Sequence, residues 1–263
     1  PSSAFTNDEN TILLIASNTS NGSTTFVDSA GAVQNEDGTR TSYVSANTTY
    51  GQSIVSATMP SSGTGLSLGH GLSSKPDMII LKSRSETAPW YVWHKGLDSE
   101  TQSYLKLNET DTYTGNTSVW NNTAPTSSVF STVSNYSIGN DSKAIAYCFH
   151  DVTGYSKFDS YTGNGSTTGP SITLGFRPSL LVIKSATVAE SWFMMDTTRT
   201  PVTTLNTYLQ AEQTADESTT ANANTVISDT GFQIKTAHEA FNKDGDTYIY
   251  MAFADKREYA YWL

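Results

Sequence analysis

The chain has 263 residues, of which 15% are charged, and its formal net charge at pH 7 is −10. Such an acidic chain repels phosphate backbones and anionic bilayers, so we expect neither a nucleic-acid partner nor binding to an anionic membrane surface. We also expect no insertion into a membrane, because no apolar run approaches the roughly 20 residues that a membrane helix needs. The single cysteine, Cys148, excludes an intrachain disulfide framework and a cysteine-based zinc site.

The first predicted elements lie in the segment 1–49, where two strand-like runs flank a polar turn. The runs are TILLIA at 11–16 and TTFVDS at 24–29. TILLIA is much shorter than the roughly 20 residues of a membrane helix and has no basic leader, so we do not interpret it as a signal peptide. We expect 1–49 to be an N-terminal β segment.

Strand-like runs recur along the rest of the chain, with Gly-, Asn-, Asp- and Ser-rich turns between them. The clearest runs are QSIVSATM, GLSLGHG, DMIILKS, WYVWHK, SYLKLNE, AIAYCFHD, KFDSYTG, SLLVIKS, SWFMMDT, GFQIKTA and TYIYMAFAD. Ser, Thr and Asn are abundant and disfavour helices, whereas Thr, Tyr, Val and Ile favour strands. Many short strands at this spacing predict an all-β fold of antiparallel sandwiches.

The sequence also contains a duplication. KPDMIILKS at 75–83 matches RPSLLVIKS at 177–185, which lies 102 residues later, and AIAYCFHD at 144–151 matches YIYMAFAD at 248–255, which lies 104 residues later. Because MIIL and LLVI are continuously apolar, we expect central strands that are covered on both faces.

The duplication and the strand pattern together predict the domain organisation. We expect two homologous antiparallel β-sandwich units of jelly-roll type, at 50–154 and 155–263, preceded by the β segment 1–49.

Several long stretches of the sequence resemble a domain of unknown function that is common in tail-associated and other structural proteins of tailed phages, many of them marine or cyanobacterial. They include VWNNTAPTSSVFS, GYSKFDSYTGNGSTTGP and GFRPSLLVIK. The N-terminal ENTILLIASNTSNGSTTFVDSAG, followed by YGQSIV, is similar to the opening of concanavalin-like (laminin-G-like) jelly rolls in those proteins. Too few residues separate these two pieces for a complete additional lectin domain.

The resemblance implies a non-enzymatic virion component at the surface of the extracellular particle. We expect a tail-fibre or adhesin module that assembles with other virion proteins, forms a homotrimer by analogy with tail fibres in general, and contacts host-surface glycans. The alternative is a capsid-decoration or head-fibre protein with a structural role. A polysaccharide-degrading tailspike is a third interpretation, which the absence of a recognisable catalytic constellation disfavours.

Aromatic side chains are the best candidates for ligand contact, because flat rings bind the apolar faces of sugars. Trp93 and Trp120 lie where the two copies differ in sequence, so we expect them to be less committed to the core than the tryptophans at equivalent repeat positions. His94, which follows Trp93, and Tyr113 complete the predicted ligand-binding set.

The run NKDGD at 242–246 is the one candidate for a metal. Asp244 and Asp246 place carboxylates at alternating positions, as in part of a calcium loop, but the closing Glu of such a loop is missing. Asp-Gly is also a common hairpin turn. We therefore expect no obligate cofactor and keep calcium as the alternative to a simple turn.

Overall fold

The computed structural model describes residues 32–254, except residues 62, 135–137 and 200–202, together with the backbone of two short N-terminal strands. These strands are β1 (Ile15–Ala16) and β2 (Val27–Asp28), which pair antiparallel within the predicted runs TILLIA and TTFVDS. The other residues of both runs lie outside the described part of the chain. Among the described residues, no helix has the length and apolar character needed to cross a membrane.

Antiparallel sheets account for nearly all of the regular structure, which confirms the predicted all-β sandwich fold. In the described residues, helical structure is limited to three short turns: α1 (Thr117–Trp120), the 3₁₀ turn η1 (Ala221–Ala223) and α2 (Glu239–Asn242). The abundance of Ser, Thr and Asn explains this, because their side chains compete with helical backbone hydrogen bonds.

The first sandwich has a large sheet in the order β10-β9-β8-β7-β12-β5-β4-β3 and a small sheet that pairs β11 with β6. The large sheet contains β3 (Val33–Asn35), β4 (Ser42–Asn47), β5 (Gln52–Thr58), β7 (Met78–Ser83), β8 (Tyr91–His94), β9 (Ser103–Lys106), β10 (Thr114–Gly115) and β12 (Lys143–Phe149). The small sheet contains β6 (Gly65–Gly69) and β11 (Val129–Val133). The first apolar core lies between these two sheets and is closed at one end by α1.

The second sandwich has a six-stranded sheet in the order β13-β22-β15-β16-β18-β19 and a four-stranded sheet in the order β14-β21-β20-β17. The larger sheet contains β13 (Ser156–Thr162), β15 (Pro178–Ser185), β16 (Phe193–Asp196), β18 (Thr207–Gln210), β19 (Ser218–Thr219) and β22 (Thr247–Ala254). The smaller sheet contains β14 (Ser171–Thr173), β17 (Thr204–Leu205), β20 (Thr225–Ser228) and β21 (Gly231–Ile234). The second apolar core lies between them.

The two larger sheets share one topology. The order β9-β8-β7-β12-β5 in the first sheet corresponds to β18-β16-β15-β22-β13 in the second. The register also corresponds, because Ile79 pairs with Cys148 in the first sheet and Leu181 pairs with Ala252 in the second. Ile79 and Leu181 are 102 residues apart, and Cys148 and Ala252 are 104 residues apart, which are the offsets of the sequence repeat.

Strands β3 and β4 extend the first sheet beyond this shared arrangement. β4 pairs with β5 from Tyr43↔Ser56 to Asn47↔Gln52, and β3 pairs with β4. In the second sheet β13 takes the place of β5 and has no further described strand beyond it. Among the described residues, β3 and β4 of the N-terminal segment therefore widen the first sheet, and no described residue of this segment joins the second.

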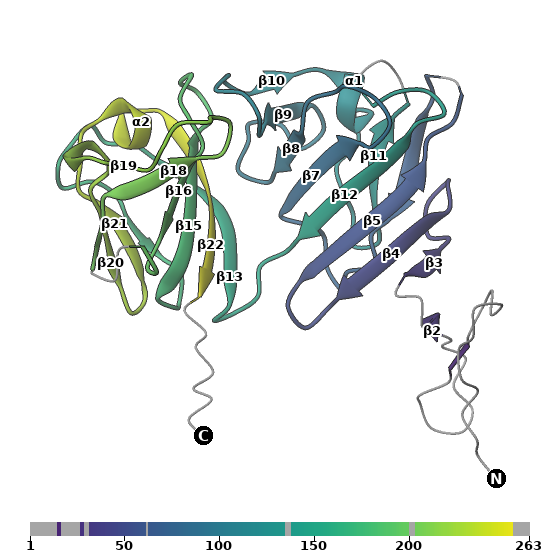
Figure 1. Cartoon of the computed structure of the whole chain (residues 1–263), viewed down its shortest axis with the longest axis horizontal. Helices are drawn as coiled ribbons and strands as arrows, with labels where there is room; N and C mark the ends of the chain where they lie inside the picture. The colour runs from purple at the N-terminus through teal and green to yellow at the C-terminus, as the bar shows by residue number, and fades with distance from the viewer. Residues whose placement is uncertain are drawn as a thin grey trace, which may run out of the picture.

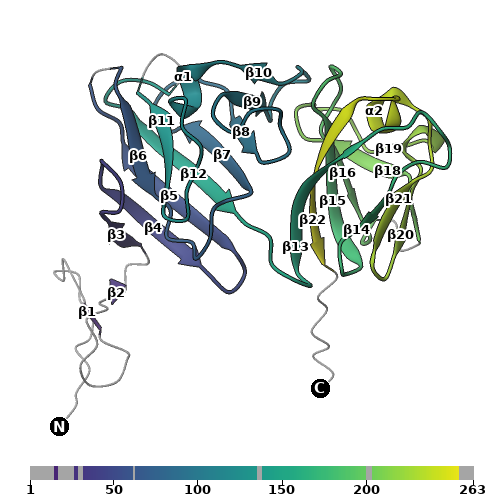
Figure 2. The same cartoon turned by 180° about the vertical axis from the view of Figure 1, so that it is seen from behind.

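The two sandwiches lie side by side and pack against each other through their larger sheets (Figures 1 and 2). A third apolar cluster fills this interface, with buried members Met78, Val92, Leu97 and Leu105 from the first half and Phe158, Val182, Ala186, Trp192 and Ile249 from the second. The indole Nε1 of Trp192 also donates a hydrogen bond to the Lys106 carbonyl across the interface at 2.9 Å.

This packing explains the two continuously apolar runs of the sequence. In β7, Ile79 belongs to the first core, whereas its neighbour Met78 belongs to the interface cluster. In β15, Leu181 belongs to the second core and Val182 to the interface cluster. Both strands are covered on both faces, as predicted.

Candidate functional site

Trp93 and Trp120 are core residues in the structure, which corrects their prediction as sugar-contacting side chains. Both are almost completely buried in the first core. Trp93 donates from Nε1 to the Glu100 carbonyl at 2.8 Å, and the Lys75 ammonium lies 5.6 Å from its ring centroid. Trp120 is the last residue of α1, and this short helix places its ring in the core. Neither ring is accessible to a ligand in this structure.

His94 is also buried and joins the two sandwiches. Its Nδ1 accepts a hydrogen bond from the Gly96 amide at 3.0 Å, so Nε2 carries the proton and donates to the Tyr250 carbonyl at 3.2 Å. Burial lowers the pKa of His94 to about 4, so the ring is neutral at pH 7. Its position makes it an interface residue without access to a ligand.

Tyr113 lies at the edge of the same interface. Its amide donates to the Ala186 carbonyl of the second sandwich at 2.8 Å. A hydrogen bond with the Asp98 carboxylate raises the pKa of the Tyr113 phenol. The structure does not bring Tyr113, His94, Trp93 and Trp120 together into one exposed site.

The NKDGD run leads from the end of α2 through a turn into β22, so its Asp-Gly pair is not the hairpin turn between two strands that such a pair commonly forms. Gly245 has φ +79°, a left-handed conformation that favours glycine. Asp244 is exposed, whereas Asp246 accepts a hydrogen bond from Thr187 and has the Lys243 ammonium 3.0 Å from its Oδ2. The described residues contain no group of three or more His, Cys, Asp or Glu side chains that could hold a metal.

A different surface of the first sandwich has the properties of a binding site. We call the face of the eight-stranded sheet that points away from β6 and β11 the outer face. Along β12, Ala144, Ala146 and Cys148 are buried in the first core, so the alternate residues Tyr147 and Phe149 point to the outer face. The second sandwich covers this face over β7, β8 and β9 and reaches Phe149 at the end of β12.

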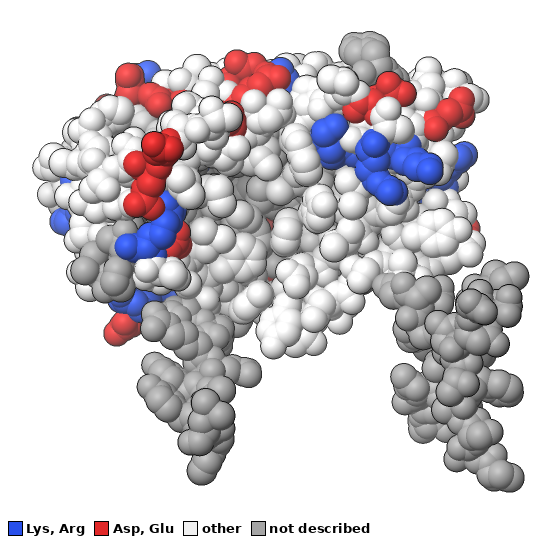
Figure 3. Space-filling model, viewed as in Figure 1, with Lys and Arg blue, Asp and Glu red and all other residues white. Residues whose placement is uncertain are grey.

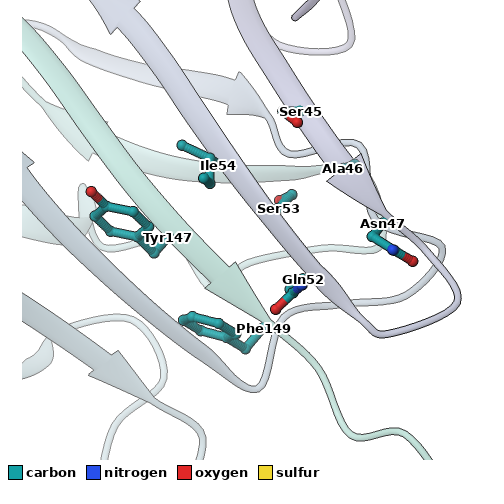
Figure 4. Close-up of a pocket in the computed structure, with 8 residues that line it drawn as sticks. All are labelled: Ser45, Ala46, Asn47, Gln52, Ser53, Ile54, Tyr147 and Phe149. Carbon is teal, nitrogen blue, oxygen red and sulfur yellow. The ribbon is translucent and has the colours of Figure 1, made fainter. Parts of the chain in front are cut away.

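The uncovered part of the outer face contains a hollow of about 430 Å³ over β4, β5 and β12 (Figure 4). Its lining residues are Ser45, Ala46, Asn47, Gln52, Ser53, Ile54, Tyr147 and Phe149. We call this hollow and its lining the open face. Ile54 is 46% exposed, an unusual value for a large aliphatic residue in the middle of a strand of a broad sheet.

Strand register places the lining side chains in two rows. One row crosses the sheet as Ser45↔Ile54↔Tyr147, and the next crosses it as Asn47↔Gln52 and on to Phe149. Each row therefore sets polar groups beside an apolar or aromatic group at fixed spacing. Among the described residues, no partner bonds the side-chain amide of Gln52 or the hydroxyl of Tyr147, so both are free to bind a ligand.

The sequence model of a family described as "Domain of unknown function (DUF7483)" matches residues 5–257. The chain belongs to the DUF7483 family. No curated protein matches it, and no solved structure does. Because the match extends over both sandwiches, the DUF7483 domain includes the interface between them.

Aromatic contacts fix one end of the open face of this DUF7483 domain. The Phe149 ring stacks on Phe158 of the second sandwich at 5.7 Å between centroids, and Tyr50 contacts Tyr155 at 4.9 Å. These pairs brace β12 and the β4–β5 turn against the second sandwich. This end of the hollow is thus fixed before a ligand binds.

Sequence reasoning missed the open face because its residues look ordinary in the sequence. The alternation in QSIVSATM and AIAYCFHD indicates strands with two faces, but it does not say which face the second half of a DUF7483 chain leaves uncovered. The available signal was weak: Ile54 and Tyr147 interrupt the usual pattern of polar residues on the exposed face of a strand.

Proposed function

We propose that this chain is a non-enzymatic carbohydrate-binding module, exposed on a tailed-phage virion as part of a tail fibre or adhesin, and that its open face contacts host-surface glycans. The phage setting is supported by the resemblance of long stretches of its sequence to tail-associated proteins. The glycan is supported by one structural observation: aromatic, amide and hydroxyl groups form rows on an uncovered sheet surface.

The chemistry of the open face suits a sugar. A saccharide has apolar C–H faces and hydroxyl groups, so it needs a ring or aliphatic surface beside donors and acceptors. Tyr147 and Ile54 offer the apolar surface, while Gln52 and Asn47 offer amides. Amide and hydroxyl groups both donate and accept hydrogen bonds, which matches the mixed character of sugar hydroxyls.

The lining of the open face supports binding without cleavage. Glycoside hydrolysis uses two carboxyl groups on either side of the bond that is broken. The eight lining residues include no Asp, Glu or His. We expect the module to bind its glycan without cleaving it. We also expect it to form a homotrimer and to assemble with other virion proteins.

Glycan binding by two single-residue variants tests the proposal. We expect the purified chain to bind host cells and a glycan array. Tyr147→Ala removes a ring contact and should weaken binding about tenfold, since such contacts contribute about 0.5–1.5 kcal/mol beyond the area they bury. Gln52→Ala removes hydrogen bonds and should weaken binding about two- to tenfold. Leu209→Ala, which truncates an exposed residue of the second sandwich, is the matched control and should bind like the native chain.

Three results would count against the proposal. Native binding by Tyr147→Ala, with an unchanged circular dichroism spectrum, would show that the open face is not the site. Binding to purified capsids but not to host cells or glycans would indicate a decoration protein. If Tyr147→Ala dissociates an oligomer in light scattering and leaves glycan binding unchanged, the open face is a contact between subunits.

A further inference from the structure

Four basic side chains gather at one end of the outer face, next to the open face. They are Arg40, Lys82, Arg84 and Lys143, and we call them the basic end. In Figure 3 the basic atoms form a group over the ends of β5 and β7 and the start of β12; acidic atoms border this group above, and the surface below it over β4 and β5 is uncharged. The net charge of the chain is −10, so a local group of four positive charges is unusual on its surface.

Hydrogen bonds and register hold three of these cations together on the sheet. Lys143 is opposite Thr58, the last residue of β5. The Arg84 amide donates to the Lys143 carbonyl at 2.6 Å, and its Nη1 donates to the Ser56 hydroxyl on the outer face at 3.2 Å. Arg40 donates from Nε to the Thr58 carbonyl at 2.8 Å. Among the described residues, neither guanidinium group makes a further hydrogen bond, so each has N–H donors left for a ligand.

Lys82 adds a fourth charge from the neighbouring strand. It is opposite Ile145, which alternates with Tyr147 on the outer face. Its ammonium lies 2.8 Å from the Ser83 carbonyl and 3.4 Å from the Glu86 carbonyl, so these contacts are with backbone oxygens and not with a carboxylate.

None of the four cations has a carboxylate of any described residue within ion-pair distance. Elsewhere in the described chain most basic side chains are paired, namely Lys75, Lys95, Lys106, Lys157, Arg177, Arg199 and Lys243. Four like charges that share one sheet end repel each other. An anionic ligand would relieve this repulsion.

A second hollow lies at the basic end. It measures about 520 Å³ and is lined by Gln34, Thr39, Arg40, Thr41, Tyr43 and Thr58. Tyr43 is 55% exposed and is opposite Ser56, so its ring lies on the outer face beside Arg40. The Glu36 carboxylate also lies at this hollow, where it accepts a hydrogen bond from Thr41. An aromatic ring next to an arginine can hold an acidic sugar, with the sugar ring on Tyr43 and its charged group on the Arg40 guanidinium.

We propose that the glycan bound by the open face is an acidic polysaccharide, whose carboxylate or sulfate groups are held by the basic end. This inference rests on the proposed function. Tyr147 and Lys143 are four residues apart on β12, about 13 Å along the strand. One chain can therefore lie over the uncharged open face and reach the basic end. The repeated negative charges of an acidic polysaccharide match a site with one neutral and one cationic part.

The experiment compares acidic polysaccharides with their own neutral forms. The probes are polygalacturonate, alginate and hyaluronate, each paired with its carboxyl-reduced form, and heparin paired with its desulfated, carboxyl-reduced form. We expect the native chain to bind the acidic form more tightly and to lose that preference as NaCl is raised, because exposed charges are screened by salt.

Two variants distinguish the basic end from net charge. The double variant Arg84→Gln/Lys143→Gln should weaken binding to the acidic forms about tenfold, at about two- to fivefold per exposed charge, and leave binding to the neutral forms unchanged. Lys235→Gln removes another cation that has no described carboxylate partner, this one in the second sandwich, and should behave like the native chain.

The possible failures are distinct. Equal binding of acidic and neutral forms by the native chain overturns the acidic preference and leaves the proposed function intact. Binding of neither form overturns both proposals. Equally tight binding of poly-glutamate, double-stranded DNA or phosphatidylglycerol vesicles overturns the assignment to a polysaccharide, because the basic end would then hold any anion.

Discussion

From the packing between the two sandwiches, we predict that Phe158→Ala strongly lowers the free energy of unfolding. Phe158 is fully buried on β13, and its ring centroid lies 5.7 Å from that of Phe149 in the first sandwich and 5.7 Å from that of Phe253. Truncation removes two aromatic contacts and leaves a cavity between the two sheets. The sheets cannot move to close this cavity, because each strand is hydrogen-bonded to its neighbours. Buried Phe→Ala substitutions cost about 3–5 kcal/mol of unfolding free energy, and we expect the upper half of that range.

Urea denaturation and scanning calorimetry measure this effect. In a chain of this size each kcal/mol lowers Tm by about 2–4 °C, so we expect Phe158→Ala to lower Tm by roughly 8–20 °C. Phe130→Ala is the matched control, because Phe130 is equally buried but lies inside the first core. Both variants should lose stability, but only Phe158→Ala should separate the unfolding of the sandwiches into two transitions. It should also weaken glycan binding, because Phe149 loses its support.

A small loss would refute this reasoning. If Phe158→Ala costs less than about 1 kcal/mol and unfolds in the same single transition as the native chain, the two sheets are not packed together as described. If Phe130→Ala also separates the two transitions, the sandwiches unfold independently and the interface does not couple them.

Two further predictions concern stability. Burial lowers the pKa of His94 from 6.5 to about 4, so the unfolded state binds a proton more readily than the folded state. The contribution of neutral His94 to the free energy of unfolding is therefore complete above pH 6.5. It falls by up to about 3 kcal/mol as the pH is lowered towards 4. His94→Gln should reduce this loss in urea titrations at pH 7 and pH 5, and an unchanged pH dependence would contradict the assignment. Gly231→Ala should destabilise the second sandwich by several kcal/mol, because a Cβ would lie 2.0 Å from the Ile172 carbonyl oxygen. Gly115→Ala, which meets nothing within 4 Å, should leave Tm nearly unchanged, and equal losses in both variants would exclude the clash as the cause.

The proposed site depends on a difference between two otherwise similar sheets. In the second sandwich the described sheet ends at β13, and the face of β13 that holds Phe158 is covered by the first sandwich. In the first sandwich β3 and β4 continue the sheet beyond β5, and the β4–β5 turn contacts the second sandwich through Tyr50 and Tyr155. The added width extends the uncovered rows by β4 and carries Tyr43 to the basic end. The duplicated fold thus supplies Gln52, Ile54, Tyr147 and Phe149, and the N-terminal segment adds the β4 side of the open face.

The sequence predicted the strands and their duplication because those depend on local and periodic information. The alternation of AIAYCFHD predicted a strand with two faces, and β12 has them. The continuous runs MIIL and LLVI predicted strands covered on both sides, and β7 and β15 are covered on both sides. Backbone hydrogen bonding and side-chain periodicity determine these features wherever the strand lies.

Which surface remains open was decided only by the tertiary structure. Trp93 and Trp120 differ between the two copies, as binding residues often do, yet α1 and the covered face of β8 bury them. Ile54 and Tyr147 look like core residues in their strands, yet they are left uncovered because the second sandwich docks near β7 and β8. Whether a strand face is exposed depends on whether another part of the chain, distant in sequence, packs against it. The periodicity of a single strand contains no information about where that other part packs.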